Sequence, residues 1–211
     1  MHPTSRQTAA YQDLSRFRLP AGFRGRGLIT VQLWWLVQAT LFHPSPQIFF
    51  GWRRFLLRLF GAHVGHGVLI RPSAEITYPW KIWIGDYSWI GDNVTLYSLA
   101  DIRIGAHSVI SQNSYLCAGS HDPDSLTFAI TALPVSIGDE CWIASDVFIA
   151  PGISIGDGTV VGTRSTVFHD LPVGMFCYGT PARPMRPRRS ALGTSGAYTE
   201  PIRAATRDSR L

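Results

Sequence analysis

Aliphatic residues recur every six positions through most of the middle of the chain. An aliphatic residue followed by glycine opens each block, at Gly65, Gly85, Gly105, Gly138, Gly156 and Gly174, so the spacing is even except for one long gap after Gly105. The recurring series reads Val64, Ile70, Ile76; Ile84, Ile90, Leu96; Ile104, Ile110, Leu116; Ile137, Ile143, Ile149; and Ile155, Val161, Val167. A period of six does not suit a helix, because it turns the side chain by ~240°. It favours short strands separated by turns.

A smaller residue recurs with the same period of six. The position four residues after each aliphatic residue is Val, Ala, Ser, Thr or Cys in 12 of 15 cases, and the exceptions are Trp80, Ile153 and Leu171. Three such hexads make a triangular coil of about 18 residues, in which glycine and aspartate supply the turns. Coils stacked ~4.8 Å apart pair their backbone groups with the coils above and below. We therefore predict a mainly β solenoid of five coils over residues 62–182, an architecture that an inert structural protein would also satisfy.

The repeat is interrupted once, within "CAGSHDPDSLTFAITALPVSIGD", residues 117–139. The gap from Gly105 to Gly138 is much longer than one coil, so we expect a loop over residues 121–136 to leave the solenoid. His121 stands at the start of this loop. Loops held by a rigid scaffold often carry function, although a single loop histidine on its own is more often idle.

The amino-terminal residues 1–61 are predicted to hold two helices. The most apolar stretch, residues 28–42, is about 15 residues long, shorter than the ~18 residues that a membrane-spanning helix needs. In the second helix, one face carries Phe49, Trp52, Phe55, Leu56 and Leu59, with Arg53, Arg54 and Arg58 largely off it. We favour a cap on the open end of the solenoid. Docking on the inner membrane, where basic amphipathic helices bind anionic lipid, is the alternative.

Charge and cysteine content narrow the class of protein. The net charge of +5 comes from the ends, because residues 1–60 hold eight Arg against one acid and residues 183–211 hold seven against two. The middle has four basic and eleven acidic residues, which argues against a nucleic-acid-binding protein. Three cysteines without C-x-x-C spacing indicate neither a disulfide framework nor a zinc site, and favour a reducing cytoplasm. We expect residues 183–211 to form a flexible basic tail.

Several longer motifs add to this picture: "GWRRFLLRLFGAHVGHGVLIRPS", "YPWKIWIGDYSWIGD", "CAGSHD" and "IGDECWIASDVFIAPGISIGDGTVVGTRSTVFHDLPVGMFCYGTPARPMRPR". From residue 14 to 188 the chain resembles the hexapeptide-repeat acyltransferases, and more narrowly the colanic-acid-type acetyltransferases of bacterial exopolysaccharide clusters. The resemblance implies a left-handed parallel β-helix, although parallel crossovers are generally right-handed. It also implies a cytoplasmic homotrimer with active sites between protomers, an acetyl-CoA donor and a saccharide acceptor that a lipid could carry.

The same resemblance assigns roles to individual residues. It makes His121 the base that accepts the proton of a sugar hydroxyl, because imidazole accepts protons near neutral pH. It places Asn93 at the acceptor site, with its neighbour Asp92 as the rival, while turn chemistry alone would also explain both. Trp142 corresponds to a tryptophan beside the base and the pantetheine arm, or it packs at a subunit face. The coenzyme A contacts implied are Trp142, Ala144, Ser145, Gly162, Thr163 and Arg183, with Arg164 as a weaker candidate.

Other functions stay open at this stage. One is acetylation of a small acceptor such as serine or a nucleotide-sugar amine, and another is a scaffold without catalysis. A carbonic anhydrase on the same solenoid needs three zinc-binding histidines with one pair about five residues apart. His107 and His121 are 14 apart and no third histidine joins them, so we expect no metal.

Overall fold

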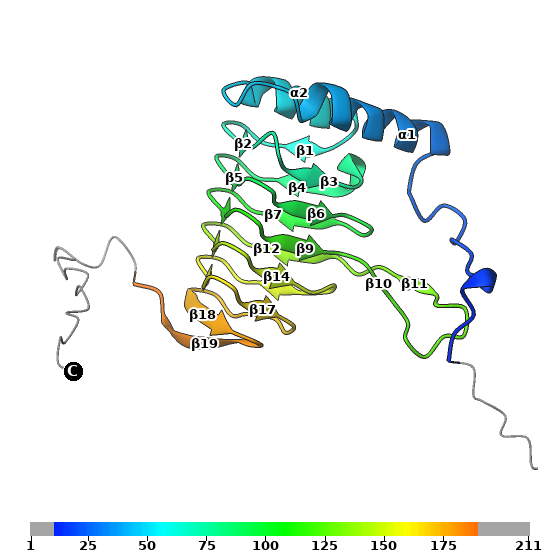
Figure 1. Cartoon of the computed structure of the whole chain (residues 1–211). Coiled ribbons are helices and arrows are strands. Elements are labelled where there is room, and N and C mark those ends of the chain that lie inside the picture. Colours follow the sequence, from blue (N-terminus) through cyan, green and yellow to red (C-terminus); the bar gives the residue numbers. More distant parts are fainter. Residues whose placement is uncertain (1–10, 190–211) are drawn as a thin grey trace, which may run out of the picture.

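A computed structural model describes residues 11–189, so the expected tail lies outside the described residues from residue 190 onward. The described chain forms a three-sided prism of stacked coils (Figure 1). Two helices cross one end of the prism, and a hairpin projects from one side. No helix within residues 11–189 is long and apolar enough to cross a membrane.

Three parallel sheets form the sides of the prism. Sheet A contains β1 (His63–Val64), β4 (Ile82–Ile84), β7 (Ile102–Ile104), β12 (Val135–Ile137) and β15 (Ser154–Ile155). Sheet B contains β2 (Leu69–Ile70), β5 (Trp89–Ile90), β8 (Val109–Ile110), β13 (Trp142–Ile143), β16 (Val160–Val161), β18 (Met175–Gly179) and β19 (Ala182–Pro187). Sheet C contains β3 (Glu75–Ile76), β6 (Thr95–Tyr97), β9 (Tyr115–Cys117), β14 (Phe148–Ile149) and β17 (Thr166–Val167). Each coil therefore contributes one short strand to each side.

The interior is filled by the residues of the six-residue series. All 15 aliphatic positions are at most 7% exposed, and strands in neighbouring coils pair these positions in register, as Ile90 does with Ile70 and Ile110. Most small positions at the corners are buried too. The three cysteines are free and buried, and burial raises the pKa of Cys141 and Cys177. The periodic core predicted from the sequence is confirmed.

The glycines after the aliphatic residues let the coils stack closely. A Cβ atom built on Gly105 would lie 2.5 Å from the carbonyl carbon of Gly138 in the next coil. Gly105→Ala should therefore lower the free energy of unfolding by about 2 kcal/mol, the usual cost of overpacking. Urea denaturation followed by circular dichroism measures this. Gly51→Ala, where a Cβ would meet only Arg54 Nη2 at 3.8 Å, is the matched control, and equal stability of the two variants would contradict the explanation.

The carboxyl-terminal end extends past the five predicted coils. Leu171 forms a parallel bridge with Ile155, and β18 pairs with β16, which begins a sixth coil. The antiparallel strand β19 then returns along β18. Because β19 spans Ala182–Pro187, ordered structure crosses the boundary expected at residue 182. The hexads stop before this point, so their period did not reveal the closing hairpin.

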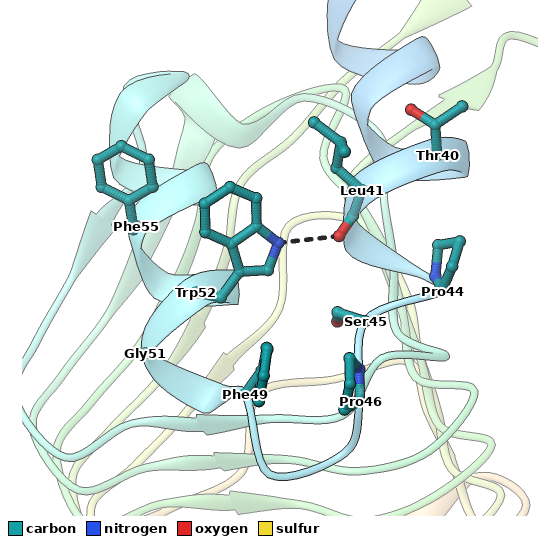
Figure 2. A pocket seen from close by; sticks show the side chains of 9 residues that line it. All are labelled: Thr40, Leu41, Pro44, Ser45, Pro46, Phe49, Gly51, Trp52 and Phe55. Atoms are coloured by element: carbon teal, nitrogen blue, oxygen red, sulfur yellow. Dashed lines mark hydrogen bonds between the residues drawn. The ribbon is translucent and has the colours of Figure 1, made fainter.

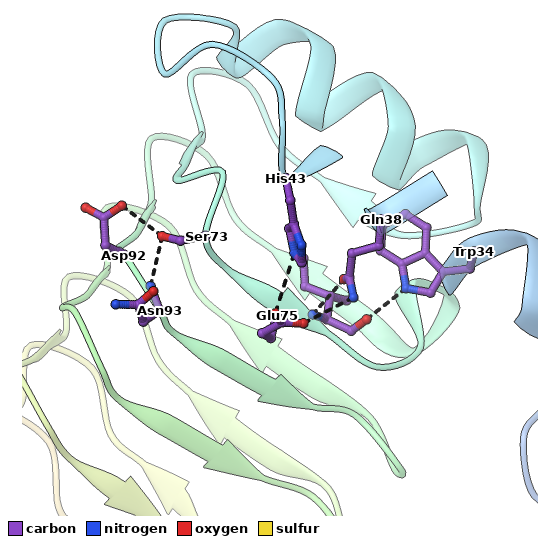
Figure 3. Close-up of polar contacts among 8 residues, drawn as sticks. Trp34, Gln38, His43, Ser73, Glu75, Asp92 and Asn93 are labelled. Carbon is purple, nitrogen blue, oxygen red and sulfur yellow. Dashed lines mark hydrogen bonds and ion pairs between the residues drawn. The ribbon is translucent and has the colours of Figure 1, made fainter. Parts of the chain in front are cut away.

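The amino-terminal segment includes η1 (Leu14–Arg16), α1 (Leu28–Val37), its π-helical continuation η2 (Gln38–Phe42) and α2 (Phe50–Leu59), and a further short turn, η3 (Pro79–Lys81), precedes β4. On the α1 side, Trp34 Nε1 donates to Ile76 O at 2.8 Å, and Gln38 Oε1 accepts from Ile76 N at 2.9 Å (Figure 3). Gln38 Nε2 also donates to Glu75 at 3.2 Å. Because β3 belongs to the first coil, no further strand pairs with Ile76 on its outer side. These side chains supply the hydrogen bonds that such a strand would make.

Three arginines of α2 cover the rest of the same edge. Each donates to a backbone carbonyl of the first coil: Arg53 to Ile70 O at 2.6 Å, Arg54 to Val68 O at 2.7 Å and Arg58 to Val64 O at 2.9 Å. Without these donors, the backbone carbonyl groups at the edge of the first coil would have no protein partner. The helices therefore close the open end of the prism.

The face of α2 that points inward differs from the predicted one. Arg53, Leu56 and Leu57 are buried against the solenoid, whereas Trp52 and Phe55 of the predicted apolar face stay exposed. The difference arises because the open edge presents carbonyl groups, which need hydrogen-bond donors as well as apolar cover.

Candidate active site

The edge between sheets B and C gathers most of the residues predicted from the sequence. Backbone hydrogen bonds stack its corners on one another, from Asn113 N to Asp92 O, from Asp146 N to Gln112 O, and from Arg164 N to Ser145 O. Several corner residues adopt a left-handed φ, for example Asn93 at 54° and Arg164 at 59°. The predicted residues at this edge are Asp92, Asn93, Ala144, Ser145, Gly162, Thr163 and Arg164.

A groove on the outer face of sheet B has a volume of about 470 Å³ and lies over the first three coils. Its lining includes Trp89, Asp92, Ser111 and Gln112, and Phe50 of α2 borders its upper end. Trp89 is exposed, and Asp92 accepts a hydrogen bond from Ser73 Oγ at 2.9 Å (Figure 3). The groove thus combines an aromatic face with a carboxylate and amide groups, a set that suits a polyhydroxylated ligand.

The two rival residues at this corner differ in their surroundings. Asp92 lines the groove and forms an ion pair with Arg71 at 3.4 Å. Asn93 is not part of the lining; its side-chain Nδ2 donates to Asn113 Oδ1 at 3.2 Å, and its backbone N donates to Ser73 Oγ. Asn93 therefore has the contacts of a corner residue.

A second groove continues down the same face, with a volume of about 420 Å³. It is lined by Trp142, Val160, Phe176, Arg186, Arg188 and Arg189. Trp142 Nε1 donates to Ser111 Oγ at 3.0 Å, so a residue of the second groove is bonded to a residue that lines the first. Guanidinium groups beside an aromatic surface suit a ligand with phosphates at one end and an apolar arm at the other.

None of the arginines that line the second groove was predicted, and the two predicted arginines lie outside its lining. Arg183 lies on β19 opposite Tyr178 and is exposed, while Arg164 is paired with Asp146 at 3.0 Å. Sequence reasoning missed Arg186, whose guanidinium lies 4.7 Å from the ring centre of Phe176, and Arg188, which donates to Glu140 O. The antiparallel return of β19 brings them here, and no hexad pattern marks that return.

Sequence reasoning also missed Trp89, for which a signal existed. In each strand of sheet B the residue before the buried aliphatic residue points outward. Trp89–Ile90 and Trp142–Ile143 repeat the same pair two coils apart, both on sheet B. Reading the outward positions as well as the buried ones would have placed both tryptophans on one face.

His121 lies on the hairpin of β10 (Ser120–His121) and β11 (Ile130–Thr131). Its Nδ1 is 2.8 Å from Phe128 O, and its ring stacks on Phe128 with centres 4.0 Å apart. A carbonyl oxygen only accepts, so Nδ1 carries the proton in this contact and neutral Nε2 is left as an acceptor. The hairpin thus holds the imidazole in the tautomer that a base requires.

The amino-terminal segment passes beside the same hairpin (Figure 1). Asp13 N donates to Leu126 O at 2.7 Å, and the ring of Phe17 lies 6.0 Å from that of His121. A segment from far earlier in the sequence therefore contacts the histidine hairpin.

One chain does not bring the histidine and the grooves together. His121 follows β9 of sheet C, whereas both grooves lie on sheet B. The histidine and the grooves do lie at the same height along the prism axis. β9 belongs to the third coil, as does Ser111, the residue that is hydrogen-bonded to Trp142. Within residues 11–189, no three His, Cys, Asp or Glu side chains are placed to hold a metal ion.

Comparisons with known proteins fit this architecture. The family "Bacterial transferase hexapeptide (six repeats)" matches residues 134–169. The Escherichia coli (strain K12) protein "Putative colanic acid biosynthesis acetyltransferase WcaF" is 62% identical over 177 residues, which cover 84% of this chain and 97% of the relative. Galactoside O-acetyltransferase of the same organism is 30% identical over 137 residues, which cover 64% of this chain and 68% of that enzyme.

Solved structures give the same result. A hexapeptide-repeat acetyltransferase from Vibrio cholerae, complexed with acetyl coenzyme A, has a TM-score of 0.70 and 27% identity over 77% of this chain and 88% of that chain. A galactoside acetyltransferase in complex with coenzyme A has a TM-score of 0.71 at 24% identity, over 81% of this chain and 84% of that chain. The predicted fold class, a left-handed parallel β-helix of hexapeptide repeats, is confirmed. The chain belongs to the hexapeptide-repeat acyltransferases and, within them, to the colanic-acid-type acetyltransferases.

Proposed function

We propose that this protein transfers an acetyl group from acetyl-CoA to a hydroxyl of a saccharide during exopolysaccharide assembly, with His121 as the general base. The observation that carries the proposal is the contact of His121 Nδ1 with Phe128 O, which leaves Nε2 as a proton acceptor. A sugar hydroxyl becomes an effective nucleophile once its proton is accepted. The names of the colanic acid relative and of galactoside O-acetyltransferase support a saccharide acceptor.

The active site is completed by a second copy of the chain. In a closed ring of identical subunits each interface joins two different faces, so the hairpin beside sheet C of one protomer meets sheet B of the next. Rotation about an axis parallel to the prism preserves height, and His121 then lies level with Ser111, between the two grooves. With the three subunits that the family resemblance implies, the ring is a homotrimer with three such sites.

Each groove then receives one substrate. The upper groove, with Trp89 and Asp92, holds the saccharide, because aromatic faces stack on sugar rings and a carboxylate accepts hydroxyl hydrogen bonds. In the lower groove, Trp142 contacts the pantetheine arm and the arginines face the phosphates. Of the two rival corner residues, Asp92 is the acceptor ligand. Ala144, Ser145, Gly162, Thr163 and Arg183 border the donor along the neighbouring edge.

The reaction is tested by incubating the protein with acetyl-CoA and candidate acceptors and following the release of free thiol. Acceptors should include galactosides, oligosaccharides from the exopolysaccharide, free serine and an amino sugar. We expect thiol release with a saccharide, and NMR of the product should show an O-acetyl ester. Release with serine or the amino sugar alone, or with no acceptor, would contradict the proposal.

The shared site predicts complementation between two inactive variants. His121→Ala and Trp142→Ala should each be inactive alone, because each spoils every site of its own trimer. Mixed trimers formed by co-expression contain interfaces at which both residues are intact, so about a quarter of wild-type activity should return. Mixing His121→Ala with Asn113→Ala, a corner change outside both grooves, is the control for exchange. Mixtures of the first two variants that stay inactive, while the control exchanges, would place the whole site within one chain.

A further inference from the structure

The outer side of the helical cap is an exposed apolar surface. Its members come from α1, η2, the turn that follows and α2, and we call them the outer cap face: Leu28, Ile29, Leu33, Leu36, Leu41, Ile48, Phe49, Trp52, Phe55 and Leu59. Ile29 is 85% exposed and Ile48 78%. Only the side of α1 that carries Val31 and Trp34 is buried. A helix that is apolar all round normally has cover on every side, so the outer cap face lacks a partner.

A cavity of about 760 Å³ opens on this face, between η2 and the start of α2 (Figure 2). Leu41, Pro44, Phe49, Trp52 and Phe55 contribute to its lining. Trp52 Nε1 donates to Leu41 O at 2.9 Å, so the polar atom of the indole is already satisfied and its ring is held in place. The cavity therefore presents mainly hydrocarbon to whatever covers the cap.

The charge around this face is positive. The helical cap itself, residues 28–59, contains three Arg and no Asp or Glu. Arg53, Arg54 and Arg58 donate to neutral carbonyls, and among residues 11–189 none of the three has a carboxylate partner within 4 Å. The nearest acid on the first coil, Glu75, lies 3.7 Å from His43. The cap thus carries positive charge that the described chain does not neutralise.

We infer that the outer cap face docks on the surface of an anionic phospholipid bilayer. Exposed Trp, Phe and Leu side chains on helices that lie flat are what an interfacial binding surface requires, and uncompensated arginines attract anionic headgroups. A protein partner would need complementary shape, whereas a bilayer accepts any apolar surface of this breadth. The docked surface differs from the basic amphipathic helix of the alternative considered from the sequence, because the arginines of α2 point into the solenoid and act only through their electric field.

The docked orientation places the upper groove close to the lipid. Phe50 lines that groove, while its neighbours Phe49, Gly51 and Trp52 line the cavity on the outer cap face. The cavity and the upper groove therefore both border the first turn of α2. Given the proposed function, the acceptor would be a saccharide carried on a membrane lipid, and this link to the acceptor rests on that function, whereas docking itself does not.

Flotation with liposomes tests the docking without any assay of activity. Vesicles of phosphatidylcholine and phosphatidylglycerol in a ratio of about two to one should carry the full-length protein to the top of a sucrose gradient, and vesicles of phosphatidylcholine alone should carry less. The triple variant Ile29→Glu, Ile48→Glu, Phe55→Glu should reduce the bound fraction at least about ten-fold, because each change removes buried apolar surface and adds a charge. Thermal unfolding should confirm that these exposed substitutions leave the fold intact.

The matched control carries three glutamates at exposed apolar positions on the opposite end of the prism, Val173→Glu, Tyr178→Glu and Met185→Glu. It should float like the wild type. Absence of binding by the wild type, or equal binding by the two triple variants, would overturn the inference. A third outcome would also overturn it: the wild type does not bind vesicles, and the outer-cap variant changes the oligomeric state measured by size-exclusion chromatography. The outer cap face would then be a contact between copies of the chain.

Discussion

Replacing His121 with alanine is expected to lower kcat for acetyl transfer by about 10²- to 10⁴-fold, the usual contribution of a positioned general base. The change removes the only imidazole on the β10–β11 hairpin and leaves the core untouched, because the hairpin lies outside the three stacked sheets. KM for acetyl-CoA should change little, since His121 is not part of the lining of the arginine-lined groove. Steady-state kinetics with the best saccharide acceptor measures both quantities.

The matched control is His66→Ala. His66 is exposed at a corner of the first coil, outside the linings of both proposed substrate grooves, so its kcat should equal that of the wild type. His121→Asn keeps a donor for Phe128 O at the position of Nδ1 but cannot act as a base, and it should be as inactive as the alanine variant. Undiminished turnover in either His121 variant would rule out this mechanism.

Replacing Arg53 with methionine is expected to lower the free energy of unfolding by about 3 kcal/mol, because buried carbonyls lose their donors. The guanidinium is fully buried and donates to Ile70 O, Pro46 O and Gln47 O as well as to Ser45 Oγ. Methionine fills similar space but leaves these carbonyls without a donor, and each unsatisfied buried group costs about 1–3 kcal/mol. Guanidinium chloride denaturation of wild type and variant measures the difference.

Two further arginine variants define the cause. Arg54→Met removes a single hydrogen bond, to Val68 O, and should cost about 1 kcal/mol or less. Arg53→Lys keeps a charge but cannot reach several carbonyls in one plane, so it should recover only part of the loss. Burial, and then repulsion from Arg71, lowers the pKa of Arg53. Equal stability of Arg53→Met and Arg54→Met would show that the hydrogen bonds do not hold the cap.

The core could be predicted because a solenoid repeats one local rule. Each hexad marks its own inward residue, so Ile90 or Ile143 can be assigned without knowing any distant contact. The same rule located His121, since an interruption is visible only against a regular period. The scaffold and the loop could therefore be read from the sequence, whereas Asp92 entered only as the rival of Asn93 at a position that the family resemblance implied.

The sequence did not predict the contacts between the repeat and segments outside it. Arg53 was assigned to a polar face of a helix, because its carbonyl partners on the first coil have no sequence signature. Arg186 and Arg188 lie in a strand that runs backwards after the last hexad, where no period applies. The proposed meeting of His121 with the grooves of a second subunit came from the family resemblance alone, because no pattern within one chain positions a neighbour.

The β10–β11 hairpin leaves the third coil and returns to it without disturbing the stack. Strands β9 and β12 on either side of it remain paired with the coils above and below, in the same register as all the others. Changes in the length or composition of this excursion therefore leave the main source of folding energy unaltered. In the proposed site, the choice of acceptor can therefore evolve through a few exposed residues of the hairpin, while the stacked coils keep the same core.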